Sequence, residues 1–212
     1  MKRHSFGPGI ALSLIVTAAC CGGGSEKATP LGLTPYEMAI AQVEGVFHTK
    51  AQFPDEDQTN EIWVDPRGAI ACVEIFVAGQ HAATRVYIND EEHLYSPEGA
   101  ELEVQPSTSP TPLAFLGSLP YLTLLAAYEH TPRGNGGNEI TLEGTVTTRE
   151  GAQESLFQSE IVLERDTLYP VRQRLTRTDE GGEIVSSDVT YGETGILDGR
   201  LDPDSRQTCR VT

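Results

Sequence analysis

The chain has 212 residues, with 31 acidic and 15 basic side chains and a formal net charge of −16 at pH 7. This length suits a single domain of generous size with room for a hydrophobic core. The charge excludes a nucleic-acid-binding class, because phosphate neutralisation requires clusters of Lys and Arg, and the sequence has none. It also argues against adsorption to anionic lipid, so attachment to a membrane would have to be covalent.

The first residues are typical of a bacterial lipoprotein signal. A short basic stretch at 2–4 precedes an apolar run at 10–16, which is too short to cross about 30 Å of hydrocarbon and is therefore expected to be cleaved. Small residues lead from this run into Cys20 and Cys21. We expect cleavage before Cys20 and lipidation of that residue. Cys21 is the next option, and an unlipidated secretory signal is the remaining alternative.

This interpretation sets the expected organisation and location of the protein. Two or three acyl chains on the first mature cysteine form a stable anchor, where one chain would not. The protein would then be held on the extracytoplasmic side of a bacterial membrane, in the cell envelope. The expected parts are a signal peptide at 1–19, a lipidated cysteine with a flexible tether at 20–33, and a folded domain at 34–212.

Two further cysteines, Cys72 and Cys209, lie within the expected domain. In an oxidising compartment they are candidates for a disulfide that joins the C-terminal tail to an early strand. A second interpretation stays open from the sequence, in which both residues are separately buried free thiols.

A helix is predicted at the start of the domain. Thr34 suits the N-cap, Pro35 suits the first helical position, and Glu37 would close a capping box. Alternating apolar residues then predict several strands. These strands are expected at 61–64, 69–77, 84–88, 93–95 and 102–104, and the second of them should be central because it is apolar on both faces.

The most apolar part of the mature chain is the segment 113–128, which follows a Pro-rich stretch at 105–112. Pro120 is expected to divide this segment into two short helices. The segment either forms a lid over a ligand cavity or packs as ordinary core, since apolar helical stripes are usually core. Because the later strands follow one another without crossover helices, we expect an α+β antiparallel meander. Those strands are predicted at 139–148, 155–165, 168–177 and 184–192.

Four segments, taken in chain order, resemble motifs of a known superfamily. They are 63–66 (Trp-Val-Asp-Pro), the hairpin at 86–97, 167–172 (Thr-Leu-Tyr-Pro-Val-Arg) and 182–191. Together they resemble the LolA/LolB-like lipoprotein-carrier superfamily, which includes RseB-type sensors and LppX/LprG-type extracytoplasmic lipoproteins. The chain departs from the family pattern at Glu91, where the hairpin usually has Gly, and in lacking the Arg usual after the Trp strand.

The resemblance implies a fold and a binding site. The fold would be α+β, with a strongly curved antiparallel sheet, or half-barrel, an N-terminal helix and a two-part helical lid over its concave side. Lipid or acyl chains would lie between lid and sheet, in an apolar cavity. The expected lining residues are Val73, Ile75, Val86, Ile88, Leu116, Leu119, Leu122 and Leu125.

The expected function is that of a membrane-anchored extracytoplasmic lipoprotein that binds lipid or an acylated ligand, as a carrier or a lipid-binding protein. The alternative is an RseB-like sensor or interaction module that binds a membrane-protein partner in envelope signalling. Nucleophile motifs, phosphate-binding loops and metal-ligand spacings are absent from the sequence. We therefore expect a non-enzyme, without catalytic residues, metal or cofactor.

Overall fold

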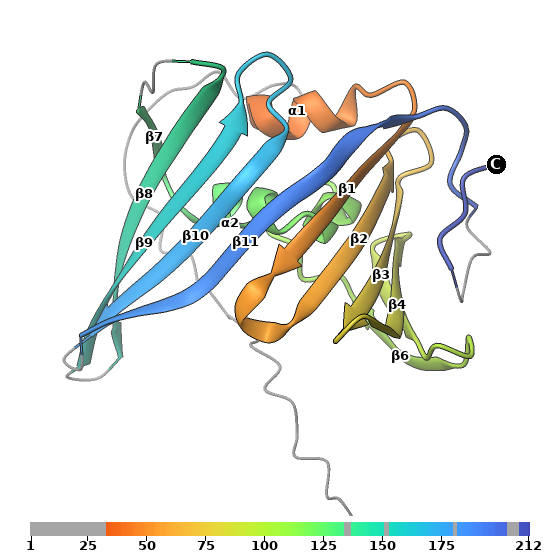
Figure 1. The fold of residues 1–212 in the computed structure, drawn as a ribbon, viewed down its shortest axis with the longest axis horizontal. Helices are drawn as coiled ribbons and strands as arrows, with labels where there is room; N and C mark the ends of the chain where they lie inside the picture. The colour runs from red at the N-terminus through yellow and green to blue at the C-terminus, as the bar shows by residue number, and fades with distance from the viewer. Residues whose placement is uncertain (1–32, 134–136, 151–152, 180–181, 203–207) are drawn as a thin grey trace, which may run out of the picture.

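The computed structural model describes residues 33–133, 137–150, 153–179, 182–202 and 208–212 (Figure 1). The predicted signal peptide, both lipidation candidates and the tether up to residue 32 lie outside the described residues. Strands hold 57% of the described residues and helices hold 14%. The protein is therefore mostly β.

One open antiparallel sheet organises the described part of the chain, with eleven strands in the order β6-β5-β4-β3-β2-β1-β11-β10-β9-β8-β7 (Figure 1). The chain proceeds from β1 to the edge strand β6, passes through a helical segment to the opposite edge at β7, and returns so that β11 pairs with β1. The strands are β1 (Val46–Phe53), β2 (Gln58–Asp65), β3 (Ile70–Val77), β4 (Gln80–Ile88), β5 (Glu91–Tyr95), β6 (Glu101–Pro106), β7 (His130–Arg133), β8 (Glu139–Glu150), β9 (Gln153–Glu164), β10 (Pro170–Asp179) and β11 (Gly182–Leu197).

The predicted fold class is wrong. The edge strands β6 and β7 lie at opposite ends of the strand order, so the sheet is open, and the described residues do not form an α+β half-barrel with an N-terminal helix and a two-part helical lid. The physical reason is the balance of lengths: strands of up to 16 residues pair along their length, whereas the α-helices have seven and eight residues. The helical elements are α1 (Pro35–Ala41), η1 (Pro54–Glu56), η2 (Ala114–Ser118) and α2 (Pro120–Ala127).

The short helix α1 begins with the predicted capping box. The backbone N–H of Glu37 donates to Thr34 Oγ1 at 3.3 Å, and the N–H of Thr34 donates to Glu37 Oε2 at 2.7 Å. These two bonds satisfy backbone donors that a helix start otherwise leaves free. Pro35 occupies the first turn, where a missing N–H costs nothing.

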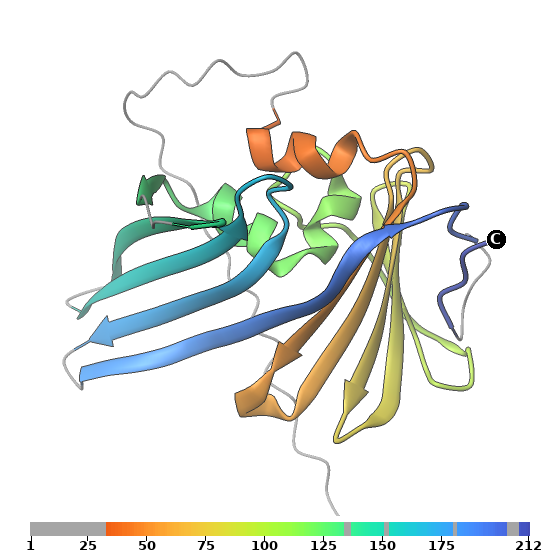
Figure 2. The same cartoon turned by 45° about the horizontal axis from the view of Figure 1, so that its top comes forward.

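The second helix, α2, buries Tyr121, Leu122 and Leu125. It begins at Pro120 and follows the 3-10 turn η2, so Pro120 divides the apolar segment 113–128. Leu116, Leu119 and Leu122 are fully buried. Most residues of α2 are apolar, and Ala126 is its exposed position. In Figure 2, α1, η2 and α2 lie on the same side of the sheet.

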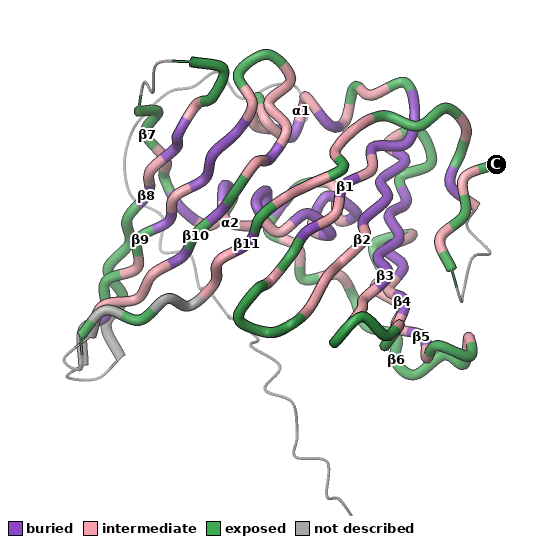
Figure 3. The backbone as a smooth tube through the Cα atoms, viewed as in Figure 1, coloured by how far each residue is buried: buried purple, intermediate pink, exposed green. Residues whose placement is uncertain are grey.

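Two hydrophobic clusters lie on opposite faces of the sheet, because successive residues of a strand point to opposite faces. The inner cluster joins the helices to both halves of the sheet, through residues such as Ile40, Leu119 and Ile161. Figure 3 shows that the buried residues of β2 and β3 lie in the last half of β2 and the first five residues of β3. The outer cluster consists of Val46, Trp63, Ile70, Cys72, Val86, Tyr95 and Leu201, with Ile88, Cys209 and Val211 packed against it.

Candidate functional site

The residues predicted to line one lipid cavity do not gather in one place. Val86 and Ile88 lie in or against the outer cluster. The other six lie in or against the inner cluster: Val73, Ile75, Leu116, Leu119, Leu122 and Leu125. The eight side chains are thus divided between two faces of the sheet.

The strand register explains this division. Val73 on β3 lies opposite Arg85 on β4, whereas Cys72 lies opposite Val86. Residues directly opposite each other share a face, so the position on β4 that faces the helices belongs to Arg85. Arg85 Nε forms an ion pair with Glu92 Oε1 at 2.9 Å. A charged pair therefore lies where apolar lining was predicted.

An exposed apolar surface occurs instead at the far ends of β8–β11. Val146, Phe157, Arg177 and Ile184 lie directly opposite one another on these four adjacent strands, so they share one face. Val146 is 37% exposed and Ile184 is 54% exposed. Leu175 lies two residues before Arg177 on the same face and is almost buried. We define Val146, Phe157, Leu175 and Ile184 as the apolar strip.

The apolar strip continues the inner face of the sheet beyond the helices. Leu142 lies four residues before Val146 on β8, and its partner Ile161 lies four residues after Phe157 on β9. Both are fully buried in the inner cluster. In Figures 1 and 2 the ends of β8–β11 extend past α2, and Figure 3 shows these strands becoming exposed toward those ends. The strip is thus contiguous with the core and lies beyond the helices that the structure describes.

Polar groups border the apolar strip. His130 Nδ1 lies 2.8 Å from the carbonyl oxygen of Tyr128 and donates to it, while His130 Nε2 lies 3.1 Å from Ser159 Oγ. Burial lowers the pKa of His130, which favours the neutral ring. Arg177 lies directly opposite Phe157, and its Cζ is 6.0 Å from the centroid of the Phe157 ring, a cation–π distance. The apolar strip is thus accompanied by a guanidinium group at Arg177 and by the polar His130–Ser159 pair.

A second polar feature lies inside the inner cluster. The hydroxyl of Tyr121 and Glu37 Oε1 are buried and have no hydrogen-bond partner among the described residues. The Tyr191 hydroxyl donates to Gln173 Oε1 at 2.6 Å, and the Tyr191 and Tyr121 rings meet edge to face at 5.9 Å. Burial raises the pKa of both phenols well above the usual range, so both stay neutral donors.

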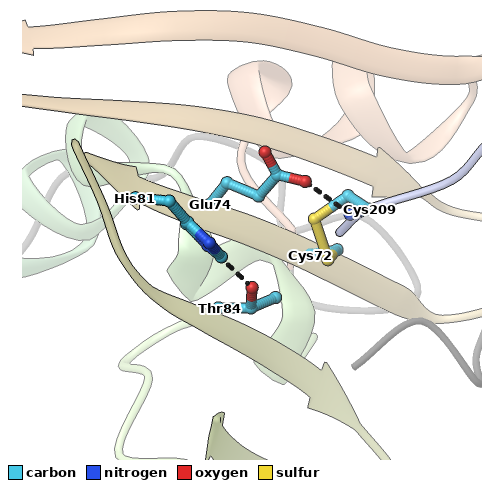
Figure 4. The surroundings of a disulfide bond; sticks show 5 residues. All are labelled: Cys72, Glu74, His81, Thr84 and Cys209. Carbon is cyan, nitrogen blue, oxygen red and sulfur yellow. Dashed lines mark hydrogen bonds between the residues drawn. A yellow bond between two sulfur atoms is a disulfide. The ribbon is translucent and has the colours of Figure 1, made fainter. Parts of the chain in front are cut away.

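Cys72 and Cys209 form a disulfide, with their Cα atoms 5.8 Å apart, that joins the C-terminal tail to the outer face of β3 (Figure 4). The free-thiol interpretation therefore does not apply in this structure. Beside the bond, the backbone N–H of Cys209 donates to Glu74 Oε1 at 2.6 Å. Burial raises the pKa of Glu74, although the Cys209 N–H and nearby His81 act in the opposite direction.

Three further histidines of the described residues, His48, His81 and His93, contact neighbouring side chains. His48 Nε2 lies 2.9 Å from Glu61 Oε1, and His81 Nε2 lies 3.1 Å from Thr84 Oγ1 (Figure 4). The described residues contain no group of three or more His, Cys, Asp or Glu side chains suited to hold a metal ion. Within the same residues, no helix has both the length and the apolar character needed to span a bilayer.

A polar depression of about 560 Å³ lies on the outer face of β7–β10. Its arginines are paired with acids: Arg133 Nη1 lies 2.8 Å from Glu143 Oε1, and Arg172 Nη2 lies 2.5 Å from Glu160 Oε1. The acidic partners neutralise the positive charge of these arginines. The side chains of the depression are therefore cross-strand ion pairs of an ordinary sheet surface. The apolar strip is the better candidate for a binding site.

No family model matches this chain, and no curated protein matches it. Two solved structures are similar to it. An uncharacterized conserved protein from Thermus thermophilus is 13% identical, with 77% of this chain and 86% of that chain covered and a TM-score of 0.46. A hypothetical protein from Chlamydia trachomatis is 7% identical, with 78% and 93% covered and a TM-score of 0.43. At these TM-scores neither likeness carries an argument about function.

Proposed function

We propose that the protein is a membrane-anchored extracytoplasmic lipoprotein that binds a lipid or acyl chain along the apolar strip. The observation that carries this proposal is the row of partly exposed apolar side chains that continues the inner cluster beyond the helices. Exposed apolar surface next to a core is a common mark of a binding surface.

The chemistry of the strip suits an amphipathic ligand. Burial of an acyl chain gains about 25 cal/mol per Å² of apolar surface and demands little directional geometry. The Arg177 guanidinium lies in the same row of side chains, and a guanidinium suits an anionic head group. The neutral His130–Ser159 pair supplies polar atoms at the border with the core.

The proposed location rests on two observations. The segment before Cys20, typical of a bacterial lipoprotein signal, supports export and anchoring. The Cys72–Cys209 disulfide supports an oxidising compartment, where such bonds persist. In a strain that expresses the full chain, a Cys20→Ser, Cys21→Ser double variant should move from the membrane fraction to the soluble extracytoplasmic pool. Retention of that variant in the membrane fraction would contradict the proposed anchor.

Ligand binding can be tested with a fatty acid that carries an environment-sensitive fluorophore. The Val146→Glu and Ile184→Glu variants place a charge on the strip at positions that are already exposed, so folding should persist. We expect each to weaken binding at least about tenfold, which corresponds to about 1.4 kcal/mol. The matched control is Leu102→Glu on the distant edge strand β6, which is 60% exposed and should bind like the wild type. Equal binding by all variants, or none by the wild type, would overturn the proposal.

A further inference from the structure

The C-terminal residues form a cover over the outer cluster. Arg200 and Thr212 exchange two backbone hydrogen bonds of 2.9 Å, and Leu201 forms a β-bridge with Val211. Leu201 is 4% exposed and belongs to the outer cluster, and Val211 packs against it. We define residues 199–202 and 208–212 as the C-terminal flap.

Apolar surface lies on the sheet face that the flap covers. Trp63, Cys72 and Val86 lie directly opposite one another on β2, β3 and β4, and none of them is more than 9% exposed. An outer sheet face of a small domain is usually solvated and polar. These residues are buried in the outer cluster, to which Leu201 of the flap belongs and against which Cys209 and Val211 pack. Trp63 is also the only tryptophan of the chain.

Two attachments of different chemistry hold the flap. At its start, the fully buried carboxylate of Asp65 accepts Arg200 Nε at 2.7 Å and the N–H of Leu201 at 3.1 Å. At its end, Cys209 is bound covalently to Cys72 and donates its N–H to Glu74. The first attachment is ionic and does not depend on redox conditions, whereas the second depends on one S–S bond.

We propose that the Cys72–Cys209 bond is a reducible latch, which an extracytoplasmic dithiol opens to release residues 208–212 from the outer cluster while Asp65 keeps the start of the flap in place. This inference does not depend on lipid binding. The matching reaction partner is a protein or small molecule with two neighbouring thiols.

The reaction is a thiol–disulfide exchange. Cys72 is 1% exposed, whereas Cys209 is partly exposed, so a thiolate of the dithiol attacks Cys209 Sγ. The Cys72–Cys209 bond breaks, and Cys72 leaves as a thiolate that takes up a proton. The second thiol of the reductant then attacks the mixed disulfide, and Cys209 leaves and is protonated. Two electrons and two protons pass to the cysteines, and the dithiol becomes a disulfide.

Opening the bond should act locally. After reduction residues 208–212 keep the Val211 bridge, the Thr212 backbone pair, the hydrogen bond from the Asp202 N–H to the Arg210 carbonyl and the hydrogen bond to Glu74. Chain ends held by so few bonds open at low free-energy cost. The inner cluster, by contrast, involves no residue of the flap. We therefore expect release of the flap with the sheet intact.

Trp63 fluorescence tests the proposal in the full-length folded protein. Dithiothreitol should reduce the disulfide under native conditions, as alkylation and mass measurement would show. Acrylamide quenching of Trp63 should then rise severalfold, its emission should shift to the red, and the far-UV circular dichroism should stay unchanged. A Cys72→Ala, Cys209→Ala variant should show high quenching with or without dithiothreitol.

Each contrary result would overturn the latch. A bond that resists dithiothreitol in the folded protein is not exchangeable. Unchanged quenching after complete reduction means that the flap stays in place without the bond. Loss of the sheet signal on reduction means that the disulfide holds the whole domain together and does not act on the flap alone.

Discussion

Asp65 and Arg200 form an ion pair between the end of β2 and the C-terminal flap, with 2.7 Å between Asp65 Oδ2 and Arg200 Nε. The same carboxylate accepts the backbone N–H groups of Arg67 and Gly68 through Oδ1, at 3.1 and 3.2 Å. One fully buried side chain thus holds both the turn after β2 and the start of the flap. A buried carboxylate is tolerated only where hydrogen bonds and charges compensate it in this way.

The Asp65→Asn substitution should destabilise the fold by about 1–3 kcal/mol, because it removes the charged acceptor of the buried Leu201 N–H and of the Arg200 guanidinium. The loss should be smaller than for a fully buried ion pair, since the side chain of Arg200 is 53% exposed and can be hydrated. Urea denaturation measures the change. The control is Asp188→Asn, which removes a partly exposed ion pair of 3.9 Å with Arg174 and should change stability by less than about 0.5 kcal/mol. Equal losses in the two variants would contradict the assigned role of Asp65.

Stability should also depend on pH through Asp65. Burial alone raises the pKa of this carboxyl, but the Arg200 guanidinium and the N–H groups of Leu201 and Gly68 outweigh burial, so the pKa lies below its usual value. A lowered pKa in the folded state means that the stabilisation is present above the unfolded pKa of about 3.9 and is lost as pH falls through the folded value. The stability gap between the wild type and Asp65→Asn should therefore close in strong acid. A gap that is constant from neutral pH to strong acid would contradict this assignment.

Gly199 should tolerate no side chain. Its φ is +119°, and a Cβ atom there would lie 2.6 Å from the carbonyl oxygen of Thr212. The Gly199→Ala substitution combines backbone strain with a clash against the flap and should cost about 1–3 kcal/mol in thermal or urea unfolding. Gly195→Ala is the control, because a Cβ there meets open space, and it should be close to neutral. Similar stability of the two variants would rule out the close approach of Gly199 and Thr212.

Leu119 should be essential to the inner cluster. It is fully buried between η2 and α2, so Leu119→Ala should destabilise the protein by about 2–5 kcal/mol through lost burial and a residual cavity. Leu102→Ala removes a side chain of the same size that is 60% exposed, and should change stability by less than about 0.5 kcal/mol. A cost below about 1 kcal/mol for Leu119→Ala would mean that the helices are not firmly packed on the sheet.

Local signals in the sequence predicted local structure. The capping box at Thr34 and Glu37 and the break at Pro120 appear as predicted, because hydrogen bonds and dihedral limits act within a few residues. The strand β1 was missed, although it pairs with both β2 and β11 in the centre of the sheet. The polar residues His48 and Lys50 interrupt the alternation of apolar residues that predicts a strand. Their partner, Glu61, lies on the neighbouring strand β2.

The sequence by itself determined where most strands lie, where helices begin, and that Cys72 and Cys209 were candidates for a disulfide. Only the tertiary structure determined on which face of the sheet each strand residue lies. Val73 and Val86 lie on opposite faces because the β3–β4 register sets Arg85 opposite Val73, and a shift of one residue would reverse this. It also decided that the apolar strip lies beyond α2 and that the flap packs against the outer cluster. Both depend on strand lengths and long-range pairing, which no local pattern encodes.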